Sequence, residues 1–227
     1  MCNKRKAYSS DELVYEKRYN AKMLFDFSEF DPYMDAFKHP PAPILSNDNL
    51  ESMSLRNWGV VPPTWQKPKE EIWNGTINAK LEYFTKRYAW REITHQRCLV
   101  PTAEYYEHHW NDPKGKSKTL YKIRHTDVEM FSIAGLWSDW VSPEGELLRT
   151  YTLVTTEANE TMRFVHNKDA QIDYHRMPLM LNPEDEMEWL DAKNDYNDFG
   201  FPNYKPRLTA EPAEPTKPTP PPQLSLF

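Results

Sequence analysis

Cys2 directly follows the initiator methionine, and Cys98 is the only other cysteine among the 227 residues of this chain. A small second residue permits removal of Met1, and Cys2 would then carry a thiol and a free α-amine on adjacent carbons. The unperturbed pKa values of these groups are about 8.5 and about 8. Such an amine can condense with an aldehyde to a Schiff base, and the thiol can then close a five-membered thiazolidine ring. Amide cleavage with the thiol as nucleophile is a second possibility. The third is that the cysteine at position 2 is incidental and has no chemical role.

The composition is that of a globular protein, with 39% hydrophobic and 14% aromatic residues. The net charge of -6 does not indicate a nucleic-acid-binding protein. Much of the acid is concentrated in residues 184–198, however, so a local basic groove elsewhere is compatible with the sequence. No run approaches the roughly 20 apolar residues of a membrane span, and nothing resembles a signal peptide.

The two cysteines are too far apart in the sequence, and too few, for a disulfide framework or a Cys-rich zinc site. They favour a reducing compartment, and we expect a cytoplasmic protein. His108 and His109 are adjacent on an expected strand and would point to opposite faces, so they cannot easily bind one metal ion. We therefore expect neither a metal nor a cofactor.

Four helices are predicted from capping signals. The Ser9-x-x-Glu12 pattern is a capping box, and in the helix that follows we expect Leu13, Tyr19 and Met23 to face inward. The other three caps are Asn78, Thr156 and Asn182, the last followed by proline and acids. The predicted helices cover residues 9–23, 78–88, 157–166 and 183–192.

Strands are predicted where β-branched and aromatic residues gather between turn signals. Gly135 is expected to turn one of them, and residues 143–145 form a hairpin signal. Trp58 is expected in the core, and Trp65, which follows two prolines, is expected to expose its ring. The predicted strands cover residues 42–45, 98–107, 120–123, 129–136, 149–155 and 177–181.

The distribution of proline along the chain indicates the domain organisation. We expect one domain over residues 2–200 and a Pro-rich flexible linker over 201–222. The final residues, 223–227, resemble the short motif that bacterial sliding clamps bind. Three apolar side chains would fill a groove on the clamp while the glutamine sets the register; the residues are Gln223, Leu224, Ser225, Leu226 and Phe227.

Nine short patterns follow one another in an order that resembles the SRAP family, the SOS-response-associated peptidases. No single pattern is specific, but nine in order over residues 2–192 make chance agreement improbable. They are Met1-Cys2, Trp58-Gly59 with Pro62, Asn78-Ala79-Lys80, Arg97-Cys98-Leu99-Val100-Pro101, Tyr106-Glu107, Ala134-Gly135-Leu136-Trp137, Thr155-Thr156-x-Ala158-Asn159, Met162 with His166-Asn167, and Arg176-Met177-Pro178.

The resemblance implies an α+β fold, in which short helices flank a central antiparallel, barrel-like sheet. It also implies a monomer that senses abasic sites in single-stranded DNA during the SOS response. The terminal cysteine would capture the ring-opened sugar as a thiazolidine crosslink, a lyase-like reaction. The family name records a proposed peptidase activity, for which the protein's own first residue is one candidate target. A non-catalytic DNA-binding module tethered to the clamp is a further alternative.

The resemblance also assigns roles. Cys2 would be the nucleophile, Asn78 would orient the amine or the sugar oxygens, and Glu107 and His166 would transfer protons. An imidazole suits that task near neutral pH, and so does a carboxyl group partly shielded by Tyr105. The expected DNA contacts are Lys4, Trp65, Lys80, Thr155 and Arg176.

The chain departs from the family pattern in four places. Asn3-Lys4 replaces Gly-Arg, Lys80 replaces an arginine that could grip phosphate with two parallel bonds, and His108 replaces tryptophan. Residues 168–175 are inserted before Arg176, which leaves open whether His166 or His175 is catalytic. His166 is favoured because it keeps the family's spacing from the Thr155 pattern.

Overall fold

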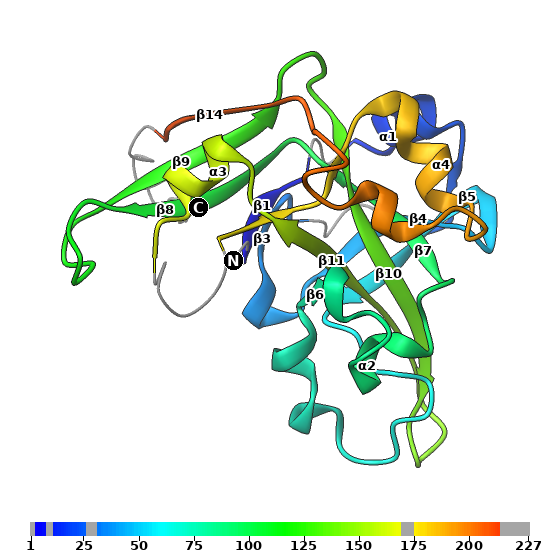
Figure 1. The fold of residues 1–227 in the computed structure, drawn as a ribbon. Coiled ribbons are helices and arrows are strands. Elements are labelled where there is room, and N and C mark those ends of the chain that lie inside the picture. Colours follow the sequence, from blue (N-terminus) through cyan, green and yellow to red (C-terminus); the bar gives the residue numbers. More distant parts are fainter. Residues whose placement is uncertain (1–2, 8–10, 26–30, 169–174, 214–227) are drawn as a thin grey trace, which may run out of the picture.

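Five strands close into a barrel in the computed structural model of the chain, which describes residues 3–7, 11–25, 31–168 and 175–213 (Figure 1). Neighbouring strands are antiparallel in the order β11-β10-β7-β4-β5. A short parallel pairing of β5 with β11, Thr150 with Asn57 and Tyr151 with Trp58, completes the ring. The barrel strands are β4 (Pro41–Ser46), β5 (Asn49–Trp58), β7 (Arg97–Thr102), β10 (Phe131–Val141) and β11 (Leu147–Glu157).

A second antiparallel sheet continues from the barrel where the chain bends at Ala103 between β7 and β8. Its order is β14-β9-β8-β1-β3, so β1, the described strand nearest the amino terminus, lies between β8 and β3. The strands are β1 (Lys4–Lys6), β3 (Tyr33–Asp35), β8 (Glu104–Trp110), β9 (Lys118–His125) and β14 (Leu208–Pro212).

Short strands and helices complete the fold. The strands are β2 (Lys22–Met23), β6 (Asn78–Lys80), β12 (Arg176–Pro178) and β13 (Met180–Leu181). The α-helices are α1 (Glu12–Tyr19), α2 (Tyr88–Arg91), α3 (Glu160–Val165) and α4 (Glu186–Leu190). Six 3-10 helices are η1 (Ala36–Lys38), η2 (Lys69–Glu71), η3 (Trp73–Thr76), η4 (Leu81–Tyr83), η5 (Pro183–Asp185) and η6 (Tyr196–Phe199). The expected α+β fold with a barrel-like, largely antiparallel sheet is confirmed. Within the described ranges, no helix is long and apolar enough to cross a membrane.

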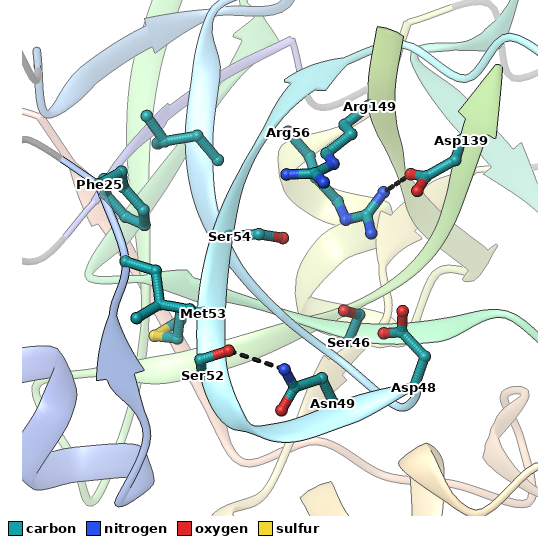
Figure 2. Close-up of a pocket in the computed structure, with 12 residues that line it drawn as sticks. Phe25, Ser46, Asp48, Asn49, Ser52, Met53, Ser54, Arg56, Asp139 and Arg149 are labelled. Carbon is teal, nitrogen blue, oxygen red and sulfur yellow. Dashed lines mark hydrogen bonds and ion pairs between the residues drawn. The ribbon is translucent and has the colours of Figure 1, made fainter. Parts of the chain in front are cut away.

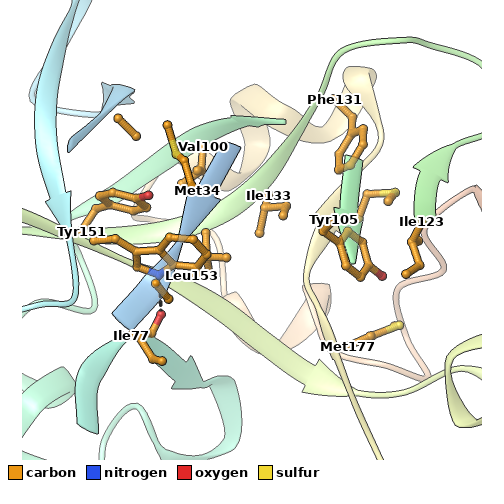
Figure 3. Packing of buried hydrophobic residues seen from close by; sticks show 14 of the residues in the cluster. Met34, Ile77, Val100, Tyr105, Ile123, Phe131, Ile133, Tyr151, Leu153 and Met177 are labelled. Atoms are coloured by element: carbon orange, nitrogen blue, oxygen red, sulfur yellow. Dashed lines mark hydrogen bonds between the residues drawn. The ribbon is translucent and has the colours of Figure 1, made fainter. Parts of the chain in front are cut away.

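The barrel interior is filled by alternate side chains of its strands, among them Val100, Ile133, Tyr151 and Leu153 (Figure 3). Trp58 is fully buried there, as predicted, and its indole N–H donates to the carbonyl of Ile77 (2.8 Å). A second core lies outside the barrel wall, where it includes residues of α1 and α4. The two cores together hold the barrel between the second sheet and the α1–α4 side.

Gly135 does not turn the chain, contrary to the prediction, but lies within the straight pairing of β10 with both neighbours. A Cβ at this position would come within 2.7 Å of the Cys98 sulfur and 2.9 Å of the Thr152 carbonyl oxygen. Glycine is required here by close packing inside the barrel. The predicted hairpin at 143–145 is confirmed, and Gly145 has the positive φ (89°) that a tight turn needs.

Helix boundaries were the least accurate predictions. Asp11 caps α1 through the backbone N–H of Leu13, whereas Ser9 lies outside the described residues. Leu13 is 64% exposed, so its predicted inward position is wrong. Asn159, not Thr156, caps α3, because Thr156 still belongs to β11.

Two longer segments also differ from prediction. Residues 78–80 form a strand, because Asn78 and Lys80 pair with Leu153 and Thr155 of β11 rather than opening a helix. β14 lies inside the expected linker and pairs with β9 along its whole length. The ordered sheet therefore extends to Pro212.

Candidate functional site

Thr155 lies between two short strands at the carboxyl-terminal half of β11. Lys80 of β6 pairs with it on one side, and Pro178 of β12 pairs with it on the other. Its side chain is 1% exposed and its hydroxyl donates to the carbonyl of Ala79 (3.4 Å). The predicted residues Asn78, Lys80, Thr155 and Arg176 are thus brought together by the pairing of β6 and β12 with one strand.

Arg176 is buried and bonded within the protein. One guanidinium nitrogen donates to the carbonyl (2.6 Å) and hydroxyl (3.1 Å) oxygens of Thr155, and the other donates to Glu82 (2.9 Å). The side chain is 5% exposed. This arrangement favours a role in positioning Thr155 and η4 over direct contact with a DNA phosphate.

His166 and His175 lie next to each other at the end of α3. The backbone N–H of Arg176 donates to Nδ1 of His166 (3.3 Å), so the neutral His166 ring carries its proton on Nε2. Nδ1 of His175 lies 2.6 Å from the carbonyl oxygen of His166 and must be the donor of that bond. The proton of the neutral His166 ring therefore lies on Nε2, whereas the Nδ1 proton of His175 is used in the bond to the His166 carbonyl.

Glu107 approaches this region from the second sheet. Tyr105, two residues earlier on the same face of β8, donates its hydroxyl to the sulfur of Met162 on α3 (3.4 Å). Asn167, which follows His166, exchanges two hydrogen bonds with the backbone of Trp110 (2.8 and 2.9 Å). α3 is thereby docked on the face of β8 that carries Tyr105 and, two residues further on, Glu107.

The amino-terminal strand leads toward the same place. β1 pairs with β8, and Lys4 lies opposite Tyr106. Because the pairing is antiparallel, the next residue toward the amino terminus, Asn3, corresponds to Glu107. Cys2 precedes Asn3 in the sequence and lies outside the described residues.

Arg5 anchors β1 to the barrel and was not identified from the sequence. Its guanidinium donates to the Pro101 carbonyl (2.7 Å) and the Tyr151 hydroxyl (3.1 Å), and it lies 5.6 Å from the ring centre of Trp58. Burial of an arginine is costly unless its donors are used, so these bonds hold the strand that precedes the site in one place. A single arginine in a basic run carries no sequence signal for this role.

Lys4 does not join the other predicted residues. It alternates with Arg5 and lines a pocket of about 330 Å³ on the opposite face of the second sheet, with Tyr33, Tyr106 and Leu120. Its expected DNA contact would therefore be to a separate part of a bound strand.

Trp65 is half-buried rather than fully exposed, and its indole N–H donates to the Pro68 carbonyl (3.1 Å). It begins a surface on which aromatic rings alternate with cations. Tyr83, 37% exposed, has three cations about 5.8 Å from its ring centre, and Tyr88, 36% exposed, has Arg91 at 5.5 Å. We call this the aromatic–cationic surface; its members are Trp65, Lys67, Lys80, Tyr83, Lys86, Arg87, Tyr88 and Arg91.

Only Trp65 and Lys80 of the aromatic–cationic surface were predicted. The missed signal was the spacing of Lys80, Tyr83, Lys86-Arg87-Tyr88 and Arg91, which interleaves cations with rings. Rings beside cations can stack on bases while the cations contact phosphates. Lys80 belongs both to this surface and to the β6 edge beside Thr155, so the surface leads to the predicted site.

The histidines considered as metal ligands serve other contacts. His109 stacks on Phe164 with ring centres 4.6 Å apart. In the part of the chain that the structure describes, no three His, Cys, Asp or Glu side chains group closely enough to hold a metal ion.

Comparison with known proteins places the chain in a family. The model of the SOS response associated peptidase (SRAP) family matches residues 1–211. The chain belongs to the SRAP family. As an SRAP protein it is similar to the abasic site processing protein YoqW of Bacillus subtilis (strain 168), with 31% identity over 201 residues, 88% of this chain and 84% of YoqW. The abasic site processing protein HMCES of Gallus gallus is 27% identical over 203 residues, 79% of this chain and 56% of that protein.

Solved structures agree with the SRAP assignment in fold. A protein from Bacteroides thetaiotaomicron superposes with a TM-score of 0.81 at 25% identity, covering 94% of this chain and 92% of that one. A protein from Bordetella bronchiseptica gives 0.78 at 23% identity, covering 94% of this chain and all of that one. The matched family range ends within β14, so the expected clamp-binding residues 223–227 lie beyond it.

Proposed function

We propose that the protein processes abasic sites in single-stranded DNA by forming a covalent thiazolidine crosslink through Cys2 once Met1 is removed. The names of its relatives, which are abasic site processing proteins, support the abasic site as the target. The observation that carries the mechanism is the β1–β8 register, which directs the amino-terminal strand to the position of Glu107.

The reaction uses only groups of the protein and the lesion. The Cys2 amine attacks C1′ of the ring-opened deoxyribose, the hydroxyl of the carbinolamine leaves as water after protonation, and an imine forms. The Cys2 thiolate then attacks the imine carbon, and the nitrogen takes a proton as the thiazolidine closes. We assign proton transfer to Glu107 and to the Nε2–H of His166, with Asn78 holding the amine or a sugar oxygen. Holding the reacting groups together supplies much of the rate.

The aromatic–cationic surface supports an unpaired strand as the substrate. Stacking of bases on exposed rings contributes about 1–3 kcal/mol per base and needs bases that are free of a partner strand. The accompanying cations should make affinity fall as salt rises. We infer that the strand flanking the lesion lies on this surface and reaches the site past Lys80.

The decisive experiment incubates the full-length protein with a uracil-containing oligonucleotide treated with uracil glycosylase. We expect a band that survives denaturation, with a mass equal to protein without Met1 plus DNA minus water. Cys2→Ser keeps the amine but cannot form the sulfur ring, so it should leave at most a labile imine. Intact mass spectrometry that still shows methionine before Cys2 would exclude the mechanism, because the amine would be blocked.

Peptidase activity is the second candidate, favoured by the description of the family itself. Cys2 would then cleave an amide, and mass spectrometry would show a shortened peptide in place of a DNA adduct. A DNA adduct with no peptide cleavage over the same period would leave the crosslinking proposal standing alone.

The carboxyl-terminal residues Gln223, Leu224, Ser225, Leu226 and Phe227 lie outside the described part of the chain. We propose that they bind the sliding clamp, which would bring a cytoplasmic, nucleoid-associated monomer to stalled replication forks during the SOS response. Deleting residues 223–227 should abolish retention on immobilised clamp and leave crosslinking intact. If the full-length protein is not retained either, the tail has another role.

A further inference from the structure

The barrel wall is open along one edge of β5. β5 and β11 pair only at Thr150–Asn57 and Tyr151–Trp58, and the preceding pair of positions, Arg149 and Arg56, is not joined. β2 pairs with β5 only at Ser52 and Met53. Among the described residues, no strand covers this edge of β5 between those two pairings.

A pocket of about 320 Å³ occupies the opening (Figure 2). We call it the seam pocket; its lining includes Phe25, Met53, Ser54, Arg56, Asp139 and Arg149. The volume is at the lower end of the range for small-molecule sites and is enough for one nucleotide. Arg149 and Thr155 are six positions apart on β11, about 20 Å of strand, so the seam pocket is distinct from the crosslinking site.

One side of the seam pocket carries two guanidinium groups. The side chain of Arg56 is 4% exposed; it donates to the carboxylate of Asp139 and lies 4.4 Å from the ring centre of Trp137, and its Nε is buried without a hydrogen-bond partner. Arg149 is exposed and lies opposite Asp139 in the β10–β11 register. Among the described residues, no carboxylate forms an ion pair with Arg149. Asp139 thus neutralises only Arg56, and Arg149 leaves a positive charge at this end of the pocket.

The other sides of the pocket differ in character. Figure 2 shows Phe25 and Met53 across β5 from the two arginines, with Ser54 between them. Asp48 lies beside Ser46, away from Arg149 in the same view. A ligand that spans the open edge of β5 would therefore meet cations at one end, apolar side chains at the other, the Ser54 hydroxyl between them, and the Asp48 carboxylate to one side.

We propose that the seam pocket binds a nucleotide. Its phosphate lies between Arg149 and Arg56, where guanidinium forks match phosphate oxygens. Its base lies against Phe25 and the exposed side chain of Leu24, and sugar hydroxyls or base amines donate toward Asp48. The ligand is either a free nucleotide or one nucleotide of a DNA strand, and both present the same chemistry to the pocket.

Isothermal titration calorimetry of the full-length protein tests the proposal with three probes: dAMP, deoxyadenosine and inorganic phosphate. We expect dAMP to bind, with an affinity that falls as salt rises, and each fragment to bind at least tenfold more weakly. Phosphate or nucleoside alone binding as tightly as dAMP would overturn the assignment of a nucleotide.

Arg149→Gln should weaken dAMP binding at least tenfold, and because Arg149 is exposed the melting temperature should not change. Lys205→Gln alters the charge equally on an exposed residue outside the pocket and should bind dAMP as the unmodified protein does. Equal dAMP binding by Arg149→Gln and the unmodified protein would refute the site. Neither variant should alter crosslinking at saturating abasic DNA, so the result does not depend on the proposed reaction.

An intact oligonucleotide distinguishes the two sources of the nucleotide. If it displaces dAMP, and Arg149→Gln weakens its own binding, the pocket holds part of a DNA strand. If dAMP binds with no competition, the pocket takes free nucleotide. Both results support the proposal, and absence of dAMP binding at millimolar concentration contradicts it.

Discussion

The two histidines at the end of α3 differ in what their ring nitrogens do. His166 accepts a backbone hydrogen bond at Nδ1, which fixes its ring and places the proton of the neutral ring on Nε2. His175 uses its Nδ1 proton on the carbonyl of His166. The geometry therefore favours His166 for proton transfer and His175 for holding the segment that carries it.

His166→Gln should lower the single-turnover rate of crosslinking by about 100-fold or more, since a positioned general acid contributes about that factor. His175→Gln can still donate to the His166 carbonyl and should lower the rate by less than about tenfold. The rate is measured from denaturing gels at saturating abasic oligonucleotide, with circular dichroism as the check on folding. A larger loss in His175→Gln would reverse the assignment.

Among the elements, β10 depends on a residue without a side chain. Gly135→Ala would place a Cβ 2.7 Å from the Cys98 sulfur and 2.9 Å from the Thr152 carbonyl oxygen inside the closed barrel. We expect the free energy of unfolding to fall by about 1–3 kcal/mol, as overpacking usually costs. Gly75→Ala is the control, because nothing lies within 4 Å of its Cβ. Equal urea midpoints for the two variants would contradict close packing at Gly135.

Binding of single-stranded DNA along the aromatic–cationic surface can also be tested with single substitutions. Tyr83→Ala removes an exposed ring surrounded by Lys80, Lys86 and Arg87, and should weaken binding of unmodified single-stranded DNA by about 1–3 kcal/mol. Phe37→Ala removes a ring that is 57% exposed and belongs to neither the aromatic–cationic surface nor the Lys4 pocket. Fluorescence anisotropy should show nearly unchanged affinity for Phe37→Ala. If that variant loses as much affinity as Tyr83→Ala, the strand does not follow the proposed surface.

Turn residues and apolar runs in the sequence correctly predicted the elements that depend mainly on neighbouring residues. The 143–145 hairpin and the buried strands around Cys98 and Leu153 follow from turn residues and apolar runs. β6 was missed because Asn78 is a good helix cap in isolation, whereas its strand exists only through pairing with Leu153, far along the chain. Arg5 was missed for the same reason, since its partners Pro101 and Tyr151 are distant in sequence. Side-chain roles and strand edges made by remote partners require the fold.

At the scale of the whole molecule, His125 couples stability to pH. Burial lowers its pKa below 6.5, and its Nδ1 accepts from the Asp127 backbone N–H (3.1 Å) while Nε2 lies 3.3 Å from the Asn182 amide oxygen. The folded state thus binds this proton more weakly than the unfolded state. The contribution of the neutral ring is fully present above about pH 6.5 and is lost as pH falls through the lower folded-state pKa.

The free energy of unfolding should therefore fall more steeply between pH 7 and pH 5 in the unmodified protein than in His125→Gln. Two other groups face or flank this region. Glu184, whose pKa Arg207 lowers to about 2, stays ionised over the range. Burial raises the pKa of Glu186, but it titrates in both proteins and its effect cancels in the comparison. Urea unfolding measures this fall in each protein. An equal fall in the unmodified protein and in His125→Gln would exclude a role for His125.

The position at which the folded domain ends can be tested by truncating the chain. β14 covers the edge of β9, and the preceding loop contributes the Tyr204 hydroxyl, which donates to Asp185 (2.8 Å) and accepts from the Asn182 backbone N–H (2.7 Å). Removing residues 214–227 should leave the melting temperature unchanged. Removing residues 201–227, the end expected from composition, exposes β9 and leaves Asn182 and Asp185 without their partner. We expect a loss of about 3–5 kcal/mol, or roughly 10 °C in melting temperature, because an unpaired strand edge and lost buried bonds act together. Equal melting temperatures for the two truncated chains would mean that β14 adds nothing to stability.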